Sequence, residues 1–458
     1  MDTNNATAIK IENNLDLAVD KLKVVQKFIK IDPNRFLKQG IWAYFLLLIF
    51  EGALRKWFLP SLATPLLIIR DPIAIWLVFK CWQRGLFPAS TYLVGMVAIG
   101  VISIFTAVFL GHGSLLVALF GARILLFHFP LIFVIGQIFN RDDIIKIGKA
   151  TLWITIPMTI LIAMQFYSPQ SAWVNRGVGG DMAGAGYSGA AGFMRPPATF
   201  SFTTGTGAYY GFAACFIFYF WFDLKHVNKL LLLGATLAMF AAIPLSISRT
   251  VLFQTAVSGV FTVLAVSRKP QYIGKLLIAV AGGVIIFAAL SQTSFFNTAL
   301  GAFTTRFTDA SAFEGGVQGT VFNRFLKGLS LAFSQAADQP YFGYGIGMGT
   351  NVGSMLLSGS KTFLIAEDEW SRLTGELGAL LGIFVILIRI GLTIKIAIAS
   401  YHKLAKNDFL PWLLLSYGTL TLSQGGWAQP TYLGFSVVIG GFMLASLNSG
   451  KTENVATK

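Results

Sequence analysis

The sequence predicts an all-α, polytopic membrane protein with about 12 transmembrane helices and a long, partly helical outer loop. Three observations predict this class. Apolar residues fill 55% of the 458 positions, and charged residues fill 12%, which is about half the usual share in a soluble domain. Repeated apolar runs reach the roughly 20 residues that cross a bilayer. Finally, Lys and Arg gather in alternate connections between these runs, as the positive-inside rule requires.

The apolar runs define the expected topology. Basic connections on one side of the spans place that side in the cytoplasm, together with both chain termini. The expected spans lie near 40–58, 61–79, 91–111, 114–139, 150–167, 203–222, 229–246, 250–267, 274–292, 372–395, 409–424 and 431–448. The basic residues of the inner connections are Lys80, Arg84, Arg141, Lys146, Lys149, Lys225, Lys229, Arg268, Lys269, Lys275, Lys403 and Lys406.

The chain divides into one membrane domain and two short terminal segments. Residues 1–38 are polar and lysine-rich, with apolar residues at helical spacing, which predicts a cytoplasmic amphipathic helix on the inner leaflet. A partly disordered tail is the alternative for this segment. Residues 39–450 form the membrane domain, with long outer loops at 168–202 and 293–371, and residues 451–458 form a cytoplasmic tail. Long connections inside a compact domain usually carry function.

Basic residues that are outside the cytoplasm or inside the spans are mostly arginines. Nine arginines and three lysines fall there, whereas lysine dominates the inner connections. A guanidinium presents a fixed fork that matches phosphate and carboxylate oxygens, so this preference indicates a bound anion. Interface anchoring is the alternative for any single arginine. The candidates are Arg195, Arg249 and Arg324 in three outer segments, with Arg123, Arg306 and Arg372 as possible additions.

Scarce carboxylates gather before the span at 372–395, in the stretch AEDEWSRLTGELG. A carboxylate there can accept a proton as a general base. We favour Glu367 over Glu369 because Glu367 lies nine residues before Glu376 and no histidine is nearby. Residues two apart point roughly 200° apart on a helix, so only one of the two acids can face a given cavity. Glu376 is expected to orient an arginine. For Asp368 the alternative is a helix N-terminus, where acidic residues are favoured by the helix dipole.

Other charges inside the spans are expected to be structural. Glu51 can pair with Arg55 one helical turn further on. Arg70 and Asp71 must be compensated, by each other or by neighbours.

Several function classes are excluded by the sequence. The net charge of +15 belongs to a membrane topology, so nucleic acid is not an expected partner. The four histidines are dispersed, no nucleotide-binding fingerprint is present, and the two cysteines lie in or beside apolar runs. We therefore expect no metal and no cofactor.

Outer arginines and an outer carboxylate suit one reaction class. An active site outside the cytoplasm must receive its energy with the substrate, and a lipid-linked diphosphate sugar is the natural activated donor. Arginines can stabilise the departing diphosphate while a carboxylate deprotonates the acceptor hydroxyl. A single displacement of this kind needs no metal.

Several segments resemble the superfamily of O-antigen ligases and Wzy-type polysaccharide polymerases. The resemblance covers the many spans, the long late outer loop, and four signatures: RPPATFSF (195–202), LSISRT (245–250), NRFLKGLSLAFSQAADQPYFGYGIGMG (323–349) and EDEWSRLTGELGALLG (367–382). FEGALRKWFLP and GARILLFHFPLIF are similar to the branch for exopolysaccharide biosynthesis. The resemblance implies a multi-pass protein of the bacterial cell inner membrane.

The resemblance also implies an activity. It implies metal-independent, inverting transfer of undecaprenyl-diphosphate-linked glycan at the periplasmic face to a glycan acceptor, in association with other polysaccharide-assembly membrane proteins. Arg195, Arg249 and Arg324 match the family's diphosphate-binding arginines. The ligases carry a His-Asn pair nine residues before the Glu-x-Gly element, where this chain has Glu367 and Asp368. This departure favours a polymerase over an O-antigen ligase acting on lipid A-core.

Two classes remain as alternatives to a glycosyltransferase. A lipid-linked oligosaccharide flippase or exporter would also use arginines within the membrane, and it would need a polar lumen. A non-catalytic scaffold for polysaccharide assembly would need neither arginines within the membrane nor a polar lumen.

Overall fold

The computed structural model describes residues 32–268, 273–274, 291–314, 330, 332, 334, 339–360 and 364–448. In the first half of the chain the elements are α2 (Arg35–Ala53), η1 (Leu54–Phe58), η2 (Pro60–Leu62), α3 (Ala63–Leu66), α4 (Arg70–Gln83), α5 (Thr91–Phe109), α6 (Leu115–Arg123), η3 (Ile124–His128), α7 (Phe129–Ile138), α8 (Arg141–Tyr167), η4 (Trp173–Asn175), β1 (Tyr187–Ala190) and β2 (Phe193–Arg195). The second half contains α9 (Thr203–Phe222), η5 (Leu224–His226), α10 (Lys229–Leu245), α11 (Arg249–Ser267), α13 (Ser294–Glu314), α16 (Asn351–Ser358), α17 (Glu369–Ala405), α18 (Phe409–Gln424) and α19 (Pro430–Asn448).

The predicted all-α membrane class agrees with these elements. The described residues contain eight helices, or runs of consecutive helices, that are long and apolar enough to cross a membrane. The shorter apolar α10 coincides with another predicted run, as do α9 and α18. The predicted number of twelve spans stays a prediction. Some predictions fall outside the described residues. They are residues 275–290 of the expected span at 274–292, the amphipathic segment up to residue 31, the tail at 451–458, and Arg324.

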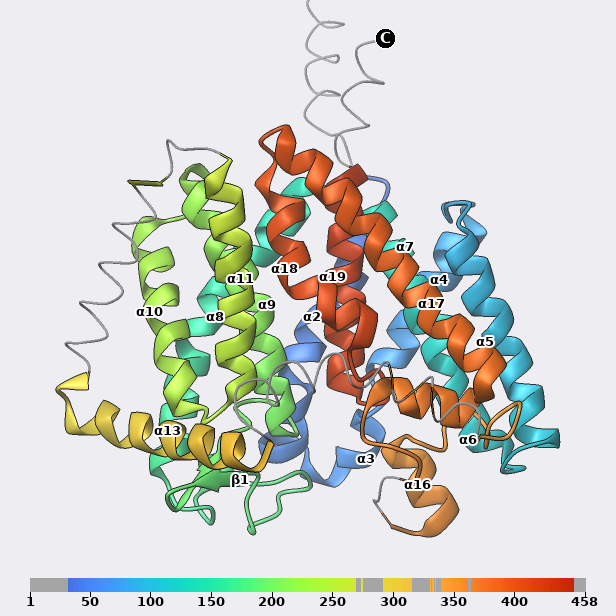
Figure 1. Ribbon diagram of the computed structural model, residues 1–458, viewed down its shortest axis with the longest axis horizontal. Helices are drawn as coiled ribbons and strands as arrows, with labels where there is room; N and C mark the ends of the chain where they lie inside the picture. Colours follow the sequence, from blue (N-terminus) through green and yellow to red (C-terminus); the bar gives the residue numbers. More distant parts are fainter. Residues whose placement is uncertain are drawn as a thin grey trace, which may run out of the picture.

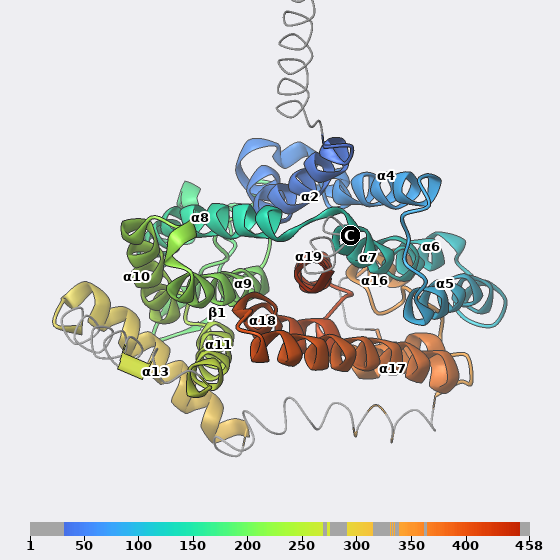
Figure 2. The same cartoon turned by 90° about the horizontal axis from the view of Figure 1, so that it is seen from above.

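The long helices stand side by side, and α13 crosses them at one end (Figure 1). The only sheet among the described residues is the antiparallel hairpin of β1 and β2, which lies at the same end as α13. Seen from above, α19 stands in the middle, with α7, α9, α18 and α2 around it (Figure 2). We call the end that carries α13 and the hairpin the loop end.

The opposite end, which we call the terminal end, holds both ends of the described chain. Lys38 near the start of α2 pairs with Asp143 at 2.7 Å, and the Asn448 side chain donates to the Gly136 carbonyl at 3.1 Å. Connections predicted to share one side meet here, because Arg141, the first residue of α8, pairs with Asp408, the N-cap of α18, at 2.7 Å. The compartment that this end faces stays a prediction.

Small residues allow α19 to occupy the centre. Gly441 faces α7 so closely that an added Cβ would lie 2.5 Å from the Cβ of Ile135. Between membrane helices, which gain little from the hydrophobic effect, such close backbone approach provides the packing contacts.

The packing at Gly441 gives a first prediction. Gly441→Ala should destabilise the purified protein by about 1–3 kcal/mol, because the new methyl group overpacks a tight contact. The matched control is Gly259→Ala in α11, where an added Cβ meets nothing within 4 Å. That control should be neutral or slightly stabilising, by up to about 1 kcal/mol. Thermal unfolding in detergent measures both, and equal midpoints would contradict the packing argument.

Candidate functional site

Helix α17 is broken near the loop end. Gly378 has φ 74° and ψ 179°, a conformation open essentially to glycine alone, so residues 369–377 form a separate half-helix. Beside the break, the carbonyls of Gly375 and Glu376 accept hydrogen bonds from another segment of the chain. The donors lie in the run PYFGYGIGMG at 340–349, which we call the Gly-rich segment. The N–H groups of Tyr344 and Gly345 donate to these two carbonyls at 2.8 and 2.9 Å.

The glycines of that segment permit its close approach to the break. An added Cβ on Gly343, whose φ is +72°, would lie 2.4 Å from the nitrogen of Gly378. In the structure the close approach is to the backbone of α17, and the loop and half-helix form one unit.

Two carboxylates and two guanidiniums hold the half-helix from within, and we call them the α17 network: Glu369, Arg372, Glu376 and Arg389. Arg372 lies between the two acids, with its Nη1 2.5 Å from Glu376 and its Nη2 3.0 Å from Glu369. Arg389 bonds Glu369 at 2.7 Å. The expectation that Glu376 orients an arginine is therefore confirmed, and the partner is Arg372.

The α17 network is almost fully buried and its charges balance. Arg389 is 0% exposed, Glu376 1% and Arg372 4%. The remaining hydrogen-bonding capacity is also used: Gly349 donates its N–H to Glu376 at 2.7 Å, and Arg389 donates to the carbonyls of Leu422 and Gly425. Buried charges persist only when they are paired and hydrogen-bonded in this way. The network therefore positions the half-helix, and its acids are occupied in doing so.

The acids that precede the half-helix behave differently. Asp368 is the N-cap of α17, and its side chain accepts the N–H of Ser371 at 3.0 Å, which agrees with the alternative reading of Asp368 as a helix start. Glu367 is exposed and forms no hydrogen bond or ion pair with any described residue. Glu367 lies before α17, which begins at Glu369. The expected angle of roughly 200° between the two side chains on a helix therefore does not apply to them. The two acids differ in burial instead, since Glu367 is exposed and Glu369 is buried.

Three of the predicted arginines gather around α13 and the hairpin. Arg195, in β2, donates from Nε to the Ser188 carbonyl at 2.9 Å. Arg306, in α13, donates to the next carbonyl along the chain, that of Gly189, at 3.2 Å. Arg249 begins α11, and one turn later Phe253 contacts the ring of Phe307 in α13. We call Arg195, Arg249 and Arg306 the α13 arginines; they lie at the same end of the bundle as the start of α17 (Figure 1).

Arg372 and Arg123 do not belong to the α13 arginines. Arg372 is part of the α17 network. Arg123 bonds Asp71 at 2.7 Å, and His128 bonds the same carboxylate at 2.9 Å. Tyr44 completes this group through its hydroxyl, 3.0 Å from His128. The sequence offered Arg123 as a possible anion ligand, and the structure shows it holding an acid in the neighbouring span.

The expected structural pairs are confirmed and extended. Glu51 pairs with Arg55 at 3.3 Å, as its spacing predicts, and also with Arg70 at 3.3 Å. Arg70 and Asp71 are thus compensated by neighbours. The Nη1 atom of Arg70 is buried without a partner among the described residues. Sequence periodicity could have suggested only the Glu51–Arg55 pair, since the other partners come from different helices.

Two of the quoted sequence segments are docked onto each other. Lys56, 0% exposed, donates to the Ala198 carbonyl at 2.5 Å, and Arg55 donates to the Ser201 hydroxyl at 2.9 Å. Thr199 returns a hydrogen bond to the Ile49 carbonyl. The end of α2 and the following η1 therefore fix the segment that follows Arg195. In this way GALRKWFLP supports RPPATFSF, just as the Gly-rich segment supports the half-helix of α17.

No group of three or more metal-binding side chains occurs within the described residues. Cys81 and Cys215 are buried and unbridged. Comparison with protein-family models, with curated proteins and with solved structures finds no match to this chain.

The α17 network gives the second prediction. Arg372→Met removes the cation between two buried carboxylates, so the protein should lose about 3–5 kcal/mol of stability. Arg35→Met, at an exposed position at the start of α2, is the matched control and should change stability by less than about 0.5 kcal/mol. Thermal unfolding of the purified proteins compares them. A small effect of Arg372→Met would mean that the acids are not held by this cation.

Proposed function

We propose that this protein is a membrane glycosyltransferase that polymerises undecaprenyl-diphosphate-linked oligosaccharide repeat units at the periplasmic face of the bacterial inner membrane. One observation carries the proposal. An accessible carboxylate, Glu367, precedes a half-helix that is clamped by buried ion pairs, at the same end of the bundle as the α13 arginines. Transfer of a glycan from a lipid-linked diphosphate requires a general base and an anion-binding site on the same face.

The proposed reaction is a single inverting displacement without a metal. The acceptor hydroxyl attacks the anomeric carbon of the donor and gives its proton to Glu367. The bond from that carbon to the diphosphate breaks, and the lipid diphosphate leaves with the electron pair. Arg195, Arg249 and Arg324 stabilise its charge, and Arg306 adds to them through its place beside the hairpin.

The structure supports Glu367 over the other acids for the base. Glu369 and Glu376 already accept hydrogen bonds from arginines in a buried, neutral network. Asp368 accepts a backbone N–H as a helix cap. A group so engaged is a weak proton acceptor, because its charged form is stabilised by its partners. We therefore assign Glu369 and Glu376 as positioning residues.

Polymerisation is favoured over ligation by residues 367 and 368. The ligases that this chain resembles have histidine and asparagine there, and this chain has two acids. The alternative to polymerisation is the same displacement reaction with lipid A-core as the acceptor, as an O-antigen ligase performs it.

A lipid-linked oligosaccharide flippase or exporter is the candidate from another class. It would need buried charges that line an open path for a glycan. The buried arginines of the described spans are instead bonded to carboxylates: Arg70 to Glu51, Arg123 to Asp71, and Arg372 to Glu376. Closed pairs of this kind favour an enzyme with a rigid framework.

The third prediction tests the base. Glu367→Gln keeps the shape of the side chain and removes its basicity, so chain extension should fall by about 10²–10⁴-fold while donor binding survives. The assay incubates the purified protein with a lipid-linked repeat unit and resolves the glycans on a gel. Asp142→Asn, an exposed acid at the terminal end, is the control and should remain active. Normal extension by Glu367→Gln would exclude Glu367 as the base.

The fourth prediction tests the anion site. Arg249→Ala should slow extension by about a hundredfold, because one charge-assisted contact to the leaving diphosphate is lost. Arg249→Lys should recover only part of the rate, since an ammonium lacks the guanidinium fork. Arg268→Ala, at the opposite end of the same helix, is the matched control and should extend chains normally. Equal activity of Arg249→Ala and Arg268→Ala would make Arg249 an interface anchor.

A further inference from the structure

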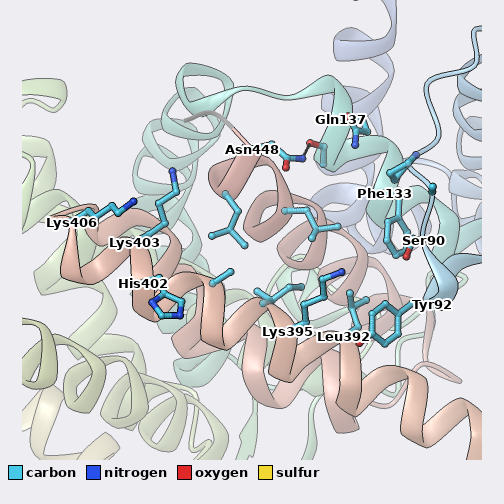
Figure 3. A pocket seen from close by; sticks show the side chains of 17 residues that line it. Ser90, Tyr92, Phe133, Gln137, Leu392, Lys395, His402, Lys403, Lys406 and Asn448 are labelled. Carbon is cyan, nitrogen blue, oxygen red and sulfur yellow. Dashed lines mark hydrogen bonds between the residues drawn. The ribbon is translucent and has the colours of Figure 1, made fainter. Parts of the chain in front are cut away.

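A cavity of about 580 Å³ opens at the terminal end, opposite to the proposed active site. It lies between α17, α19, the end of α7 and the start of α5 (Figure 3). The proposed function makes no use of it.

The charged side chains that line this cavity are lysines. Three lysines line the cavity: Lys395 and Lys403 in α17, and Lys406, the C-cap of that helix. Their spacing places them on one side of the helix. No carboxylate is among its described lining residues. Asp408, two residues beyond Lys406, is already paired with Arg141 at 2.7 Å. Within the described part of the chain, no carboxylate that lines the cavity offsets the positive charge of these lysines.

Lys395 differs from a lysine that anchors the end of a helix at the membrane surface. It lies ten residues before the last residue of α17, or about 15 Å along the axis, within a candidate membrane span. It approaches the ring of Tyr92, 5.6 Å from the centroid, and forms no ion pair with any described residue. A lysine at that depth needs a counter-charge or water, whereas lysines at a helix terminus simply extend to the interface.

The start of α5 adds to the positive potential. Ser90, the N-cap of α5, lines the cavity and its side chain does not cap the helix. The first turn of α5 carries no acidic residue that would offset the positive end of the helix dipole.

Besides the polar side chains of Gln137, His402 and Asn448, the cavity has an apolar lining that runs along α17. Leu392 and Ile396 are buried on α17, and Leu444 lines the cavity from α19. Leu392 precedes Lys403 by eleven residues, about 16 Å along the helix. A ligand that fits this lining has an anionic head near the end of α17 and an apolar chain directed along it.

We propose that this cavity binds the phosphate-bearing head of an anionic lipid from the leaflet at the terminal end. The phosphate lies among Lys395, Lys403 and Lys406, and an acyl chain follows Leu392 and Ile396. The proposal does not depend on the proposed function, because it concerns the other end of the molecule.

Native mass spectrometry of the full-length protein in detergent tests this proposal. The probes are phosphatidylglycerol, zwitterionic phosphatidylcholine and inorganic phosphate. Near a membrane surface each lysine adds about a fivefold preference for anionic lipid, so Lys395→Gln, Lys403→Gln and Lys406→Gln together should weaken phosphatidylglycerol binding by about a hundredfold. The control combines Lys80→Gln, Lys225→Gln and Lys229→Gln, which remove the same charge outside the cavity and should retain binding.

A second variant separates shape from charge. Ala399→Trp keeps every lysine and fills the cavity from its α17 wall, so it should also abolish the tight phosphatidylglycerol site. Three outcomes would overturn the proposal: equal losses in the two triple variants, unchanged binding in Ala399→Trp, or equal binding of phosphatidylcholine. Complete displacement by millimolar inorganic phosphate would overturn the lipid as the source of the phosphate.

Discussion

The loop end of this protein depends on the break in α17 at Gly378. A helix that stops inside a bundle exposes carbonyls that must find donors, because water is scarce at that depth. Here the donors are the N–H groups of Tyr344 and Gly345, supplied by a segment far away in sequence. The same half-helix contains Glu369, Arg372 and Glu376, so the backbone break and the buried ion pairs support each other.

Compensation by remote partners recurs through the spans. Asp71 in α4 meets Arg123 and His128 from the α6–η3 run, and Glu51 in α2 meets Arg70 in α4. Each pair joins two helices, so each charge specifies which helices are neighbours. Buried ion pairs contribute little net stability compared with apolar packing, but breaking one is costly. We infer that these pairs fix the arrangement of the helices more than they stabilise it.

The sequence predicted the class of fold well because hydropathy and basic connections are local signals. The runs that became α5, α11 and α19 could be read directly, and so could the Glu51–Arg55 pair, whose members lie one turn apart. The run predicted at 150–167 missed the start of α8, because the helix extends back through the basic residues of the inner connection to Arg141. The link from Glu369 to Arg389 could not be predicted. It crosses from the half-helix to the main part of α17 and exists only because Gly378 changes the chain direction, which no periodic pattern reveals. The role of the Gly-rich segment was hidden for the same reason.

The two proposed sites, one at each end of the bundle, use different cations, and this difference has a physical meaning. At the loop end Arg195 and Arg306 bond successive carbonyls of the hairpin, so their guanidiniums are already oriented, which suits a leaving group whose charge develops in one direction. At the terminal end Lys395, Lys403 and Lys406 are flexible point charges around a cavity. Such charges hold a mobile lipid head without imposing a geometry. Oriented arginines suit chemistry, and flexible lysines suit attachment to the membrane.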